Sequence, residues 1–141
     1  MMKKVLAYRN CFICGKDSKT GLKLDFEITE AGAQTSYTPQ DEFEGFKGVV
    51  HGGILCALLD EVMWKSINGH TGVITMTAKM EVKFKRPALV GTKLLVKGSV
   101  IGRRKKFFEA QAVVSDTEGN ILAEASGLFV EMDRTFGVPG K

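Results

Sequence analysis

Hydrophobic and polar residues follow two different periods along this chain, and each period predicts a different kind of element. From Gly52 to about Ile67, apolar residues recur every three to four positions, which is typical of an α-helix that packs on a core. Apolar residues occupy its other sides as well, so we expect protein to surround this helix almost completely. Asn68 and Gly69 follow and are expected to end the helix.

Most of the remaining chain alternates between apolar and polar residues, as strands with one buried face do. The clearest run extends from Val73 to Lys85, where the even positions are apolar and the odd positions largely polar. The expected strands span residues 22–28, 33–37, 73–85, 94–100, 107–115 and 121–132. Because turn residues separate most neighbours, we expect hairpins and an antiparallel sheet with the helix on one face. The other face is left to solvent or to a second copy of the chain.

The length of 141 residues predicts a single domain over residues 1–141, with a core of about 11–132 and a flexible tail over 133–141. Hydrophobic residues make up 44% and charged residues 26%, which argues against a disordered chain or a coiled coil. The net charge of +4 is mild, so it suits an anionic small ligand at least as well as a nucleic acid.

The apolar runs and the cysteines indicate where the protein works. The longest apolar run, Ile54 to Leu59, falls far below the roughly 18 residues of a membrane span, and the run near the N-terminus is too short for a signal peptide. Three cysteines are an odd number, so we expect free thiols and a cytoplasmic protein. We interpret Cys11 and Cys14 as small packing residues rather than as a metal or redox site, because no further zinc ligands accompany them.

Two glycines open the predicted helix directly after His51. Gly52 and Gly53 leave backbone N–H groups of the first turn accessible to a ligand oxygen, where they can polarise a carbonyl or hold an oxyanion. The alternative is a tight entry turn that needs small residues.

Asp60 lies on an otherwise apolar side of the helix. Its neighbours three and four residues away are Cys56, Ala57, Met63 and Trp64. Removing a carboxylate from water without a partner costs several kcal/mol, so Asp60 has either a structural hydrogen bond or a chemical role. Glu61 precedes Lys65 by four residues, the favourable orientation of a surface pair, and we interpret Glu61 as an ordinary solvated residue.

His51 and Asp60 are nine residues apart, so they point to opposite sides of the helix. The separation corresponds to a rotation of about 180° and a rise of about 13 Å. One helix therefore cannot aim both residues at the same atom. If they serve one site, the helix start comes from one subunit and Asp60 from another, which predicts a dimer with shared sites.

These residues resemble a known family. A His-Gly-Gly motif at 51–53 with an acid nine positions after the histidine, and a long strand ending in Phe-Lys-Arg-Pro at Pro87, is similar to the hotdog-fold acyl-CoA thioesterases. The phenylacetate-pathway and 4-hydroxybenzoyl-CoA thioesterase-like branches are the most similar, and the Cys-Phe-x-Cys-Gly opening at Cys11 resembles one subgroup. The likeness runs from about Cys11 to Met132. It implies an α+β hotdog fold, in which an antiparallel β-sheet wraps around one long central helix.

The resemblance also implies roles for individual residues. Asp60 would be the catalytic carboxylate, as general base or nucleophile, and the N–H of Gly53, with that of Gly52, would polarise the thioester carbonyl from the partner subunit. His51 would position this loop or touch the thioester. Thr77 would orient the attacking water. It lies on the polar face of its strand, which is natural only if that face meets the partner's site or if a bulge intervenes.

Basic residues near two predicted turns fit the phosphates of coenzyme A, which Arg and Lys recognise. The candidates are Lys85, Arg86, Arg103, Arg104 and Lys105. A solvated turn is the alternative for each of them. We expect no metal, and no cofactor other than the coenzyme A that the substrate carries.

Together these features predict an enzyme, an acyl-CoA thioesterase that hydrolyses a thioester to the free acid and coenzyme A as a homodimer or a dimer of dimers (a homotetramer). The alternative is a non-catalytic acyl-CoA-binding module or regulator on the same fold, which Asp60 disfavours because a pure binder gains from an apolar residue there. A dehydratase or hydratase needs a histidine placed to abstract a proton from carbon, and His51 and His70 do not resemble that arrangement. Neither nucleic acid nor membrane is expected as a partner, and the acyl group stays open.

Overall fold

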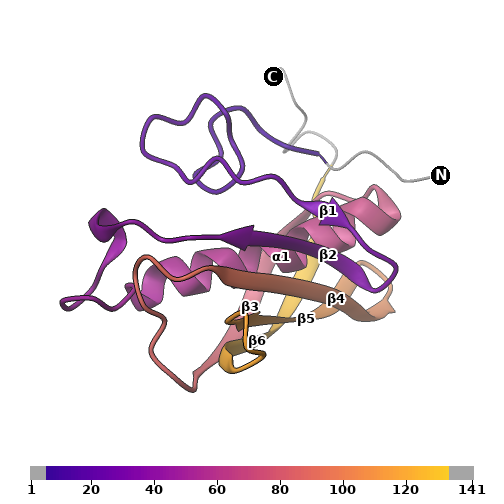
Figure 1. The fold of residues 1–141 in the computed structure, drawn as a ribbon. Coiled ribbons are helices and arrows are strands. Elements are labelled where there is room, and N and C mark those ends of the chain that lie inside the picture. Colours follow the sequence, from indigo (N-terminus) through magenta and orange to yellow (C-terminus); the bar gives the residue numbers. More distant parts are fainter. Residues whose placement is uncertain (1–5, 134–141) are drawn as a thin grey trace.

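One long helix lies across one face of a six-stranded antiparallel sheet in the computed structural model, which describes residues 6–133 (Figure 1). The helix is α1 (Gly52–Thr71), and a short 3₁₀ helix, η1 (Asp41–Phe43), precedes it. The strands are β1 (Glu27–Ile28), β2 (Gly32–Tyr37), β3 (Thr75–Phe84), β4 (Leu94–Arg104), β5 (Phe107–Ser115) and β6 (Ile121–Glu131). They lie in the order β1-β2-β4-β5-β6-β3, and all neighbouring strands are antiparallel.

The predicted order of helix and strands is confirmed, and the details differ in several places. β1 has two residues instead of the predicted seven, because Leu22, Leu24 and Phe26 pack against the core from an irregular segment. β3 pairs with β6 and not with β4, so the chain between β3 and β4 crosses the sheet instead of forming a hairpin. The helix η1 has no counterpart among the predicted elements.

The helix α1 extends beyond its predicted end. Asn68 and Gly69 are buried within it, and a side chain at Gly69 would lie 2.2 Å from Ile28 Cδ1, so this glycine serves packing. The helix ends at Gly72, whose φ of +75° is left-handed and whose N–H donates to Asn68 O at 2.8 Å. The expected glycine stop therefore exists, but at Gly72 instead of Gly69.

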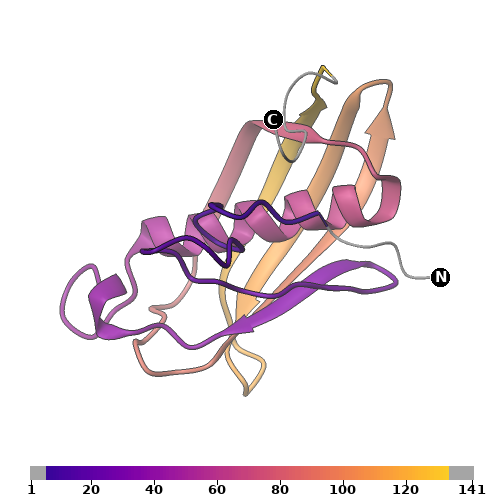
Figure 2. The ribbon, with the colours of Figure 1, turned by 90° about the horizontal axis from the view of Figure 1, so that it is seen from above.

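The core lies between α1 and the sheet. Its fully buried large side chains come from the helix and from the central strands: Leu58, Leu59, Val62, Met63, Ile67, Leu94, Val96, Phe108, Val114 and Phe129. The N-terminal segment, residues 6–26, lies over the side of α1 that faces away from the sheet (Figures 1 and 2). The helix is therefore enclosed from both sides, as its apolar composition predicts.

A bulge in β3 reverses which side chains face the helix. The register with β6 shifts between Thr77 and Lys79, which leaves Ala78 as the extra residue. Before the bulge the even residue Met76 is 52% exposed, whereas the even residue Met80 after it packs against the core. The strict alternation predicted for this strand is therefore wrong at its start, and the predicted alternative of a bulge is the one that the structure contains.

β3 forms one edge of the sheet, and one of its two hydrogen-bonding edges is unpaired within residues 6–133. Among the helices of this described range, none has the length and apolar character of a membrane-crossing helix. All three cysteines are free thiols. The predicted tail over 133–141 lies outside the described residues except for Asp133, and the extent of the domain stays a prediction.

Candidate active site

Asp60, in the middle of α1, faces β3 and is held by a hydroxyl from that strand. The Thr77 hydroxyl donates to Asp60 Oδ1 at 2.6 Å, and both side chains are half-buried. The bulge at Ala78 allows this contact, because it turns the first residues of β3 toward the helix. Two residues that were singled out separately in the sequence thus meet within one protomer.

A cavity of about 290 Å³ opens beside Asp60. Its lining combines a few polar groups with apolar and aromatic walls: Tyr8, Cys11, Asp60, Glu61, Trp64, Ile74, Thr75 and Met132. Such a mixture is typical of small-molecule sites. The buried Thr75 Oγ1 has no hydrogen-bond partner in the described part of the chain, so this lining residue has a polar atom to offer a ligand or a water.

A larger hollow of about 760 Å³ lies elsewhere, beside β2 and β4. Its lining includes Lys23, Asp25, Glu27, Lys93 and Lys97, all exposed to solvent. It holds no paired acid and hydroxyl like Asp60 and Thr77. We therefore place the candidate active site at the smaller cavity.

Burial raises the pKa of the Asp60 carboxyl above its usual value, and the hydrogen bond from Thr77 acts in the opposite direction by lowering it. A carboxylate of raised pKa is a stronger base, and it is ionised only at pH values above that raised pKa. This combination suits a group that accepts a proton from water.

The first turn of α1 is exposed and partly capped by its own histidine. His51 is the N-cap residue, and its Nδ1 accepts a hydrogen bond from the N–H of Gly53 at 2.8 Å. The Gly53 N–H, expected to be accessible to a carbonyl, is therefore occupied by His51. The N–H of Gly52 has no acceptor among the described residues, so it is the accessible donor of this turn.

The predicted phosphate-binding residues lie at two opposite ends of the sheet. The Arg103 guanidinium lies 3.9 Å from the Glu131 carboxylate. Glu131 is paired in the sheet with Thr75, which lies at the Asp60 end of β3. Lys85 directly follows Phe84, whose ring faces Gly52 at the helix start. The ten residues of β3 separate these ends by about 30 Å. Within one protomer the two groups therefore cannot hold the same phosphate.

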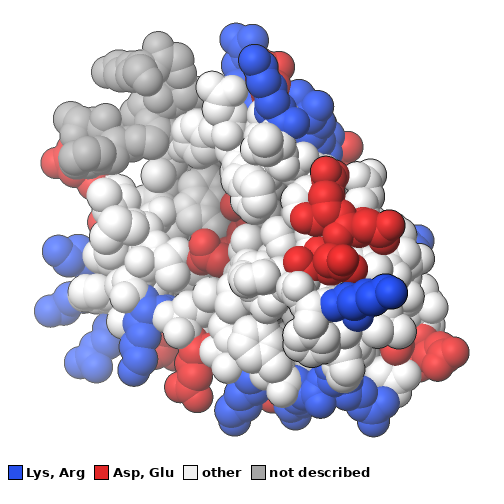
Figure 3. Space-filling view, turned by 90° about the vertical axis from the view of Figure 1, so that its left-hand side faces the viewer, with Lys and Arg blue, Asp and Glu red and all other residues white. Residues whose placement is uncertain are grey.

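Several of these basic side chains already have partners. Lys85 pairs with Glu124 at 3.1 Å, Arg86 donates to Asn120 Oδ1 at 2.9 Å, and the Arg103 guanidinium lies 4.5 Å from the centre of the Phe108 ring. Arg104 and Lys105 are exposed. Figure 3 shows the end of the molecule that carries η1, where basic side chains gather at the rim and acidic ones nearer the centre. On this face the basic residues form no single continuous patch.

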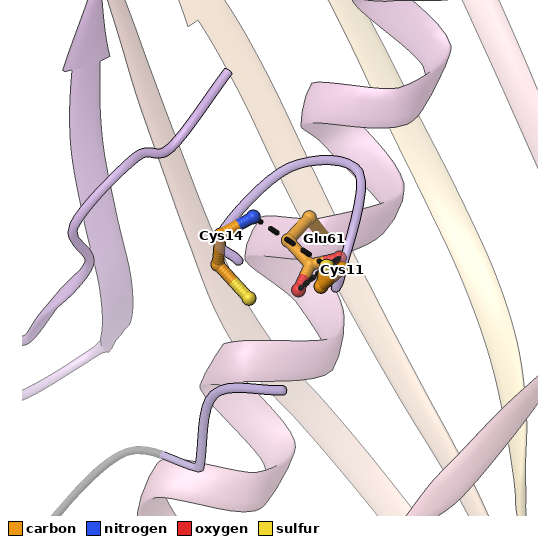
Figure 4. A group of neighbouring side chains, drawn as sticks. All are labelled: Cys11, Cys14 and Glu61. Atoms are coloured by element: carbon orange, nitrogen blue, oxygen red, sulfur yellow. Dashed lines mark hydrogen bonds between the residues drawn. The ribbon is translucent and has the colours of Figure 1, made fainter. Parts of the chain in front are cut away.

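Sequence reasoning missed a cluster of charged and thiol groups that adjoins the cavity of Asp60. Figure 4 shows three of its members, Cys11, Cys14 and Glu61. Glu61, predicted to be solvated, is largely buried, with its side chain 18% exposed, and Lys65 is 1% exposed, with 3.7 Å between Lys65 Nζ and Glu61 Oε1. The predicted pair thus exists, but not at the surface. The Cys11 thiol lies 3.7 Å from Glu61 Oε1, and Lys65 Nζ lies 3.2 Å from Cys14 Sγ. The interpretation of the cysteines as purely apolar packing is therefore wrong.

An antiparallel sheet wrapped around one long helix is the hotdog fold, as predicted. A model of the thioesterase superfamily matches residues 47–123, which include the helix start, Asp60 and Thr77. The chain therefore belongs to the thioesterase superfamily. The family expected from the His-Gly-Gly motif is confirmed, and thioester hydrolysis is the enzyme class that this family indicates.

Individual relatives agree with this assignment. Over 92 residues the chain is 29% identical to an acyl-coenzyme A thioesterase, THEM4, from Bos taurus, covering 64% of this chain but only 37% of that protein. A crystal structure of a thioesterase superfamily protein has a TM-score of 0.81 at 22% identity, covering 87% of this chain and 61% of that one.

Two further solved structures share the fold. The Escherichia coli PaaI protein from the phenylacetic acid degradation operon has a TM-score of 0.72 at 20% identity, covering 78% of this chain and 84% of that one. A Streptococcus mutans protein bound to acetyl CoA has a TM-score of 0.72 at 18% identity, covering 77% and 88%. At these identities both structures support the fold.

Proposed function

We propose that this protein is an acyl-CoA thioesterase in which Asp60 carries the reaction. The observation that carries the proposal is the pairing of Asp60 with Thr77 at a cavity, in a chain of the thioesterase superfamily. The bovine relative named acyl-coenzyme A thioesterase and the structure bound to acetyl CoA support this substrate class.

The chemistry follows from what the two side chains can exchange. As a general base, Asp60 takes a proton from water and the hydroxide attacks the thioester carbonyl; the C–S bond then breaks and coenzyme A leaves as the thiol with the proton that Asp60 returns. As a nucleophile, Asp60 attacks the carbonyl itself and the thiolate of coenzyme A leaves, after which water hydrolyses the anhydride to the free acid and Asp60 and supplies the proton of the thiol. Thr77 donates to Asp60 in either route, so it fixes the orientation of the carboxylate. No metal or cofactor enters this scheme, and that expectation stays a prediction.

We infer that two copies of the chain complete each site. Asp60 and the helix start are too far apart on α1 to contact one carbonyl. Within residues 6–133, β3 presents an unpaired edge, on which Met76 and Phe84 are exposed, 52% and 56%. Pairing of two β3 edges in antiparallel fashion brings the Asp60 end of one copy to the helix-start end of the other. The site would then join Asp60 with the partner's first turn.

The same arrangement unites the divided basic residues. Arg103, Arg104 and Lys105 lie at the Asp60 end, whereas Lys85 and Arg86 lie at the helix-start end. In the dimer both groups flank each shared site, one group from each copy, and they would hold the phosphates of coenzyme A. The free thiols fit the predicted cytoplasmic location, which stays a prediction.

A hydrolysis assay tests the proposal. Release of coenzyme A is measured for a panel of aromatic, short-chain and medium-chain acyl-CoAs with the wild type, with Asp60→Asn and with Glu30→Gln, an exposed acid between β1 and β2 at the other edge of the sheet. We expect turnover by the wild type, a loss of at least about a hundredfold in kcat for Asp60→Asn, and no change for Glu30→Gln. Binding of acyl-CoA without any turnover would instead favour a binding module, and full activity of Asp60→Asn would exclude Asp60 from the reaction.

A further inference from the structure

We propose that Cys11 and Cys14 form a dithiol site that exchanges with low-molecular-weight disulfides. In this site Cys11 is the attacking thiolate and Cys14 the resolving thiol (Figure 4). The site adjoins the cavity of Asp60 but does not depend on thioester hydrolysis.

The backbone holds the two cysteines in one tight turn. The N–H of Gly15 donates to Cys11 O at 2.9 Å, so residues 11–15 form a single helical turn with the cysteines three positions apart. A side chain at Gly15 would lie 2.4 Å from Arg9 O and 2.5 Å from Cys11 N, so this turn requires glycine. Positions three apart in a helical turn lie within the distance range that a disulfide spans.

The side chains are close enough to react. The two Sγ atoms and a carboxylate oxygen of Glu61 all lie within 4.8 Å of one another. The N–H of Cys14 also donates to Cys11 Sγ at 3.4 Å. A disulfide between them therefore needs the two sulfur atoms to move together by a few ångströms, mainly through rotation of the side chains.

The two thiols differ in accessibility. Cys11 is half-buried and lines the cavity beside Asp60, whereas Cys14 is 4% exposed. A disulfide entering from solvent therefore meets Cys11 first. Cys14 is protected from outside reagents but reaches a sulfur attached to Cys11.

A buried ammonium group stabilises negative charge in this cluster. Lys65 is 1% exposed, and its Nζ lies 3.2 Å from Cys14 Sγ and 3.7 Å from Glu61 Oε1. Hydrogen bonding from the Cys14 thiol, above all, lowers the pKa of Cys11 to about 5. The hydrogen bond with Cys11, and then burial, raise the pKa of Cys14, and burial raises that of Glu61 to about 7. The Cys11 thiol donates toward Glu61 Oε1, 3.7 Å away, and Glu61, whose pKa is the higher of the two, can take this proton and leave a thiolate at the accessible cysteine.

The reaction balances in two steps. The Cys11 thiolate attacks one sulfur of a disulfide R–S–S–R, which forms a mixed disulfide on Cys11 and releases R–S⁻. Cys14 then loses its proton and attacks Cys11 Sγ, which forms the Cys11–Cys14 disulfide and releases the second R–S⁻. The dithiol is oxidised by two electrons, and the reagent disulfide is reduced to two thiols after protonation.

The two cysteine sulfurs and the Glu61 oxygen also have a spacing that a soft metal ion would accept. The charge of the cluster decides between disulfide exchange and metal binding. The Lys65 ammonium already occupies the space between Cys14 and Glu61, and a second cation there would be repelled. This repulsion favours exchange chemistry over metal binding.

Mass spectrometry of the reduced full-length chain, treated with oxidised glutathione in the absence of any acyl-CoA, tests the site. For the wild type we expect a Cys11–Cys14 disulfide and an unmodified Cys56, which is half-buried and serves as the internal control. Cys14→Ser should keep a stable glutathione adduct on Cys11. Cys11→Ser should leave Cys14 unmodified, and its far-ultraviolet circular dichroism shows whether it is folded.

Three results would overturn the inference. The first is a Cys56 that reacts as fast as Cys11 in the folded wild type. The second is a wild type whose Cys11 and Cys14 both remain reduced over the whole range of glutathione potentials. The third is stoichiometric binding of zinc alone that blocks both thiols. Since none of these measurements involves acyl-CoA or its hydrolysis, the three results leave the thioesterase proposal unaffected.

Discussion

The start of α1 and its middle differ in how completely one protomer satisfies their polar groups. At the start, the Gly52 N–H has no acceptor among residues 6–133, and the Gly53 N–H donates only to the side chain of His51. In the middle, Asp60 accepts a hydrogen bond from Thr77, and Glu61 is close to an ammonium and a thiol. The polar groups in the middle thus have partners within one chain, whereas the start has a free N–H that can donate to a ligand oxygen. A site that needs both must draw them from two copies.

Replacement of Lys65 by methionine tests how strongly the middle depends on its network. The change leaves Glu61 buried without its cation, and breaking a buried pair in this way costs about 3–5 kcal/mol of unfolding free energy. The exposed Lys47→Met, near the helix start, should change it by less than about 0.5 kcal/mol. Urea unfolding measures the unfolding free energy of both variants. Equal losses for Lys65→Met and Lys47→Met would show that the middle of α1 does not depend on its charged network more than the helix start does.

Proline at Gly52 tests the helix start. Proline fits the first position of a helix but removes the N–H, so we expect a loss of about a hundredfold in kcat, as for other lost oxyanion donors. Unfolding free energy should change by less than about 1 kcal/mol, since the Gly52 N–H has no acceptor among the described residues. A variant that keeps full kcat would show that this N–H does not contact the thioester.

Removal of the Thr77 hydroxyl sharpens the account of Asp60. Thr77→Val takes away the hydrogen bond that lowers the pKa of Asp60, so this pKa should rise further. Because the ionised carboxylate is the active form, the acidic limb of the kcat profile should move to higher pH, with a loss of about tenfold at neutral pH. A variant in which kcat drops while the limb stays in place would assign Thr77 a role other than tuning Asp60.

The smallest effect is expected from the exposed basic residues. Arg104→Ala should raise KM for acyl-CoA about threefold, as the loss of one exposed ion pair does, and leave kcat unchanged. A thioester that lacks the nucleotide of coenzyme A should be hydrolysed equally by both proteins. An equal rise in KM for that short thioester would mean that Arg104 does not contact a phosphate.

Much of the fold follows from the sequence, because burial of one face makes apolar residues recur every two positions in a strand and every three to four positions in a helix. The alternation over β5 and β6 predicts their bounds to within one residue, and the apolar residues of α1 predict a helix enclosed by protein. The bulge at Ala78 has no compositional signal. The sequence indicated it only indirectly. Thr77 lies among the polar positions of its strand, which should face away from the helix, whereas the role that the resemblance implies for Thr77 requires it to face the site.

The charged cluster was missed for a different reason. A glutamate and a lysine four residues apart on a helix are typical of its surface, and the spacing of Glu61 and Lys65 does not indicate whether the pair is buried. The apolar composition on all sides of α1 is the signal that would have placed this pair inside the protein. The contacts with Cys11 and Cys14 depend on how residues 6–26 fold back over the helix, which local patterns do not specify.

Complementation between two inactive variants tests the shared site most directly. Asp60→Asn and Gly52→Pro chains are co-expressed with different affinity tags, and the mixed oligomer is purified over both tags. Each mixed dimer contains one site with both replacements and one site with neither, so we predict CoA release at about half the wild-type rate from a sample of mixed dimers. A mixed oligomer that assembles but is no more active than its two parents would contradict a site built from two copies.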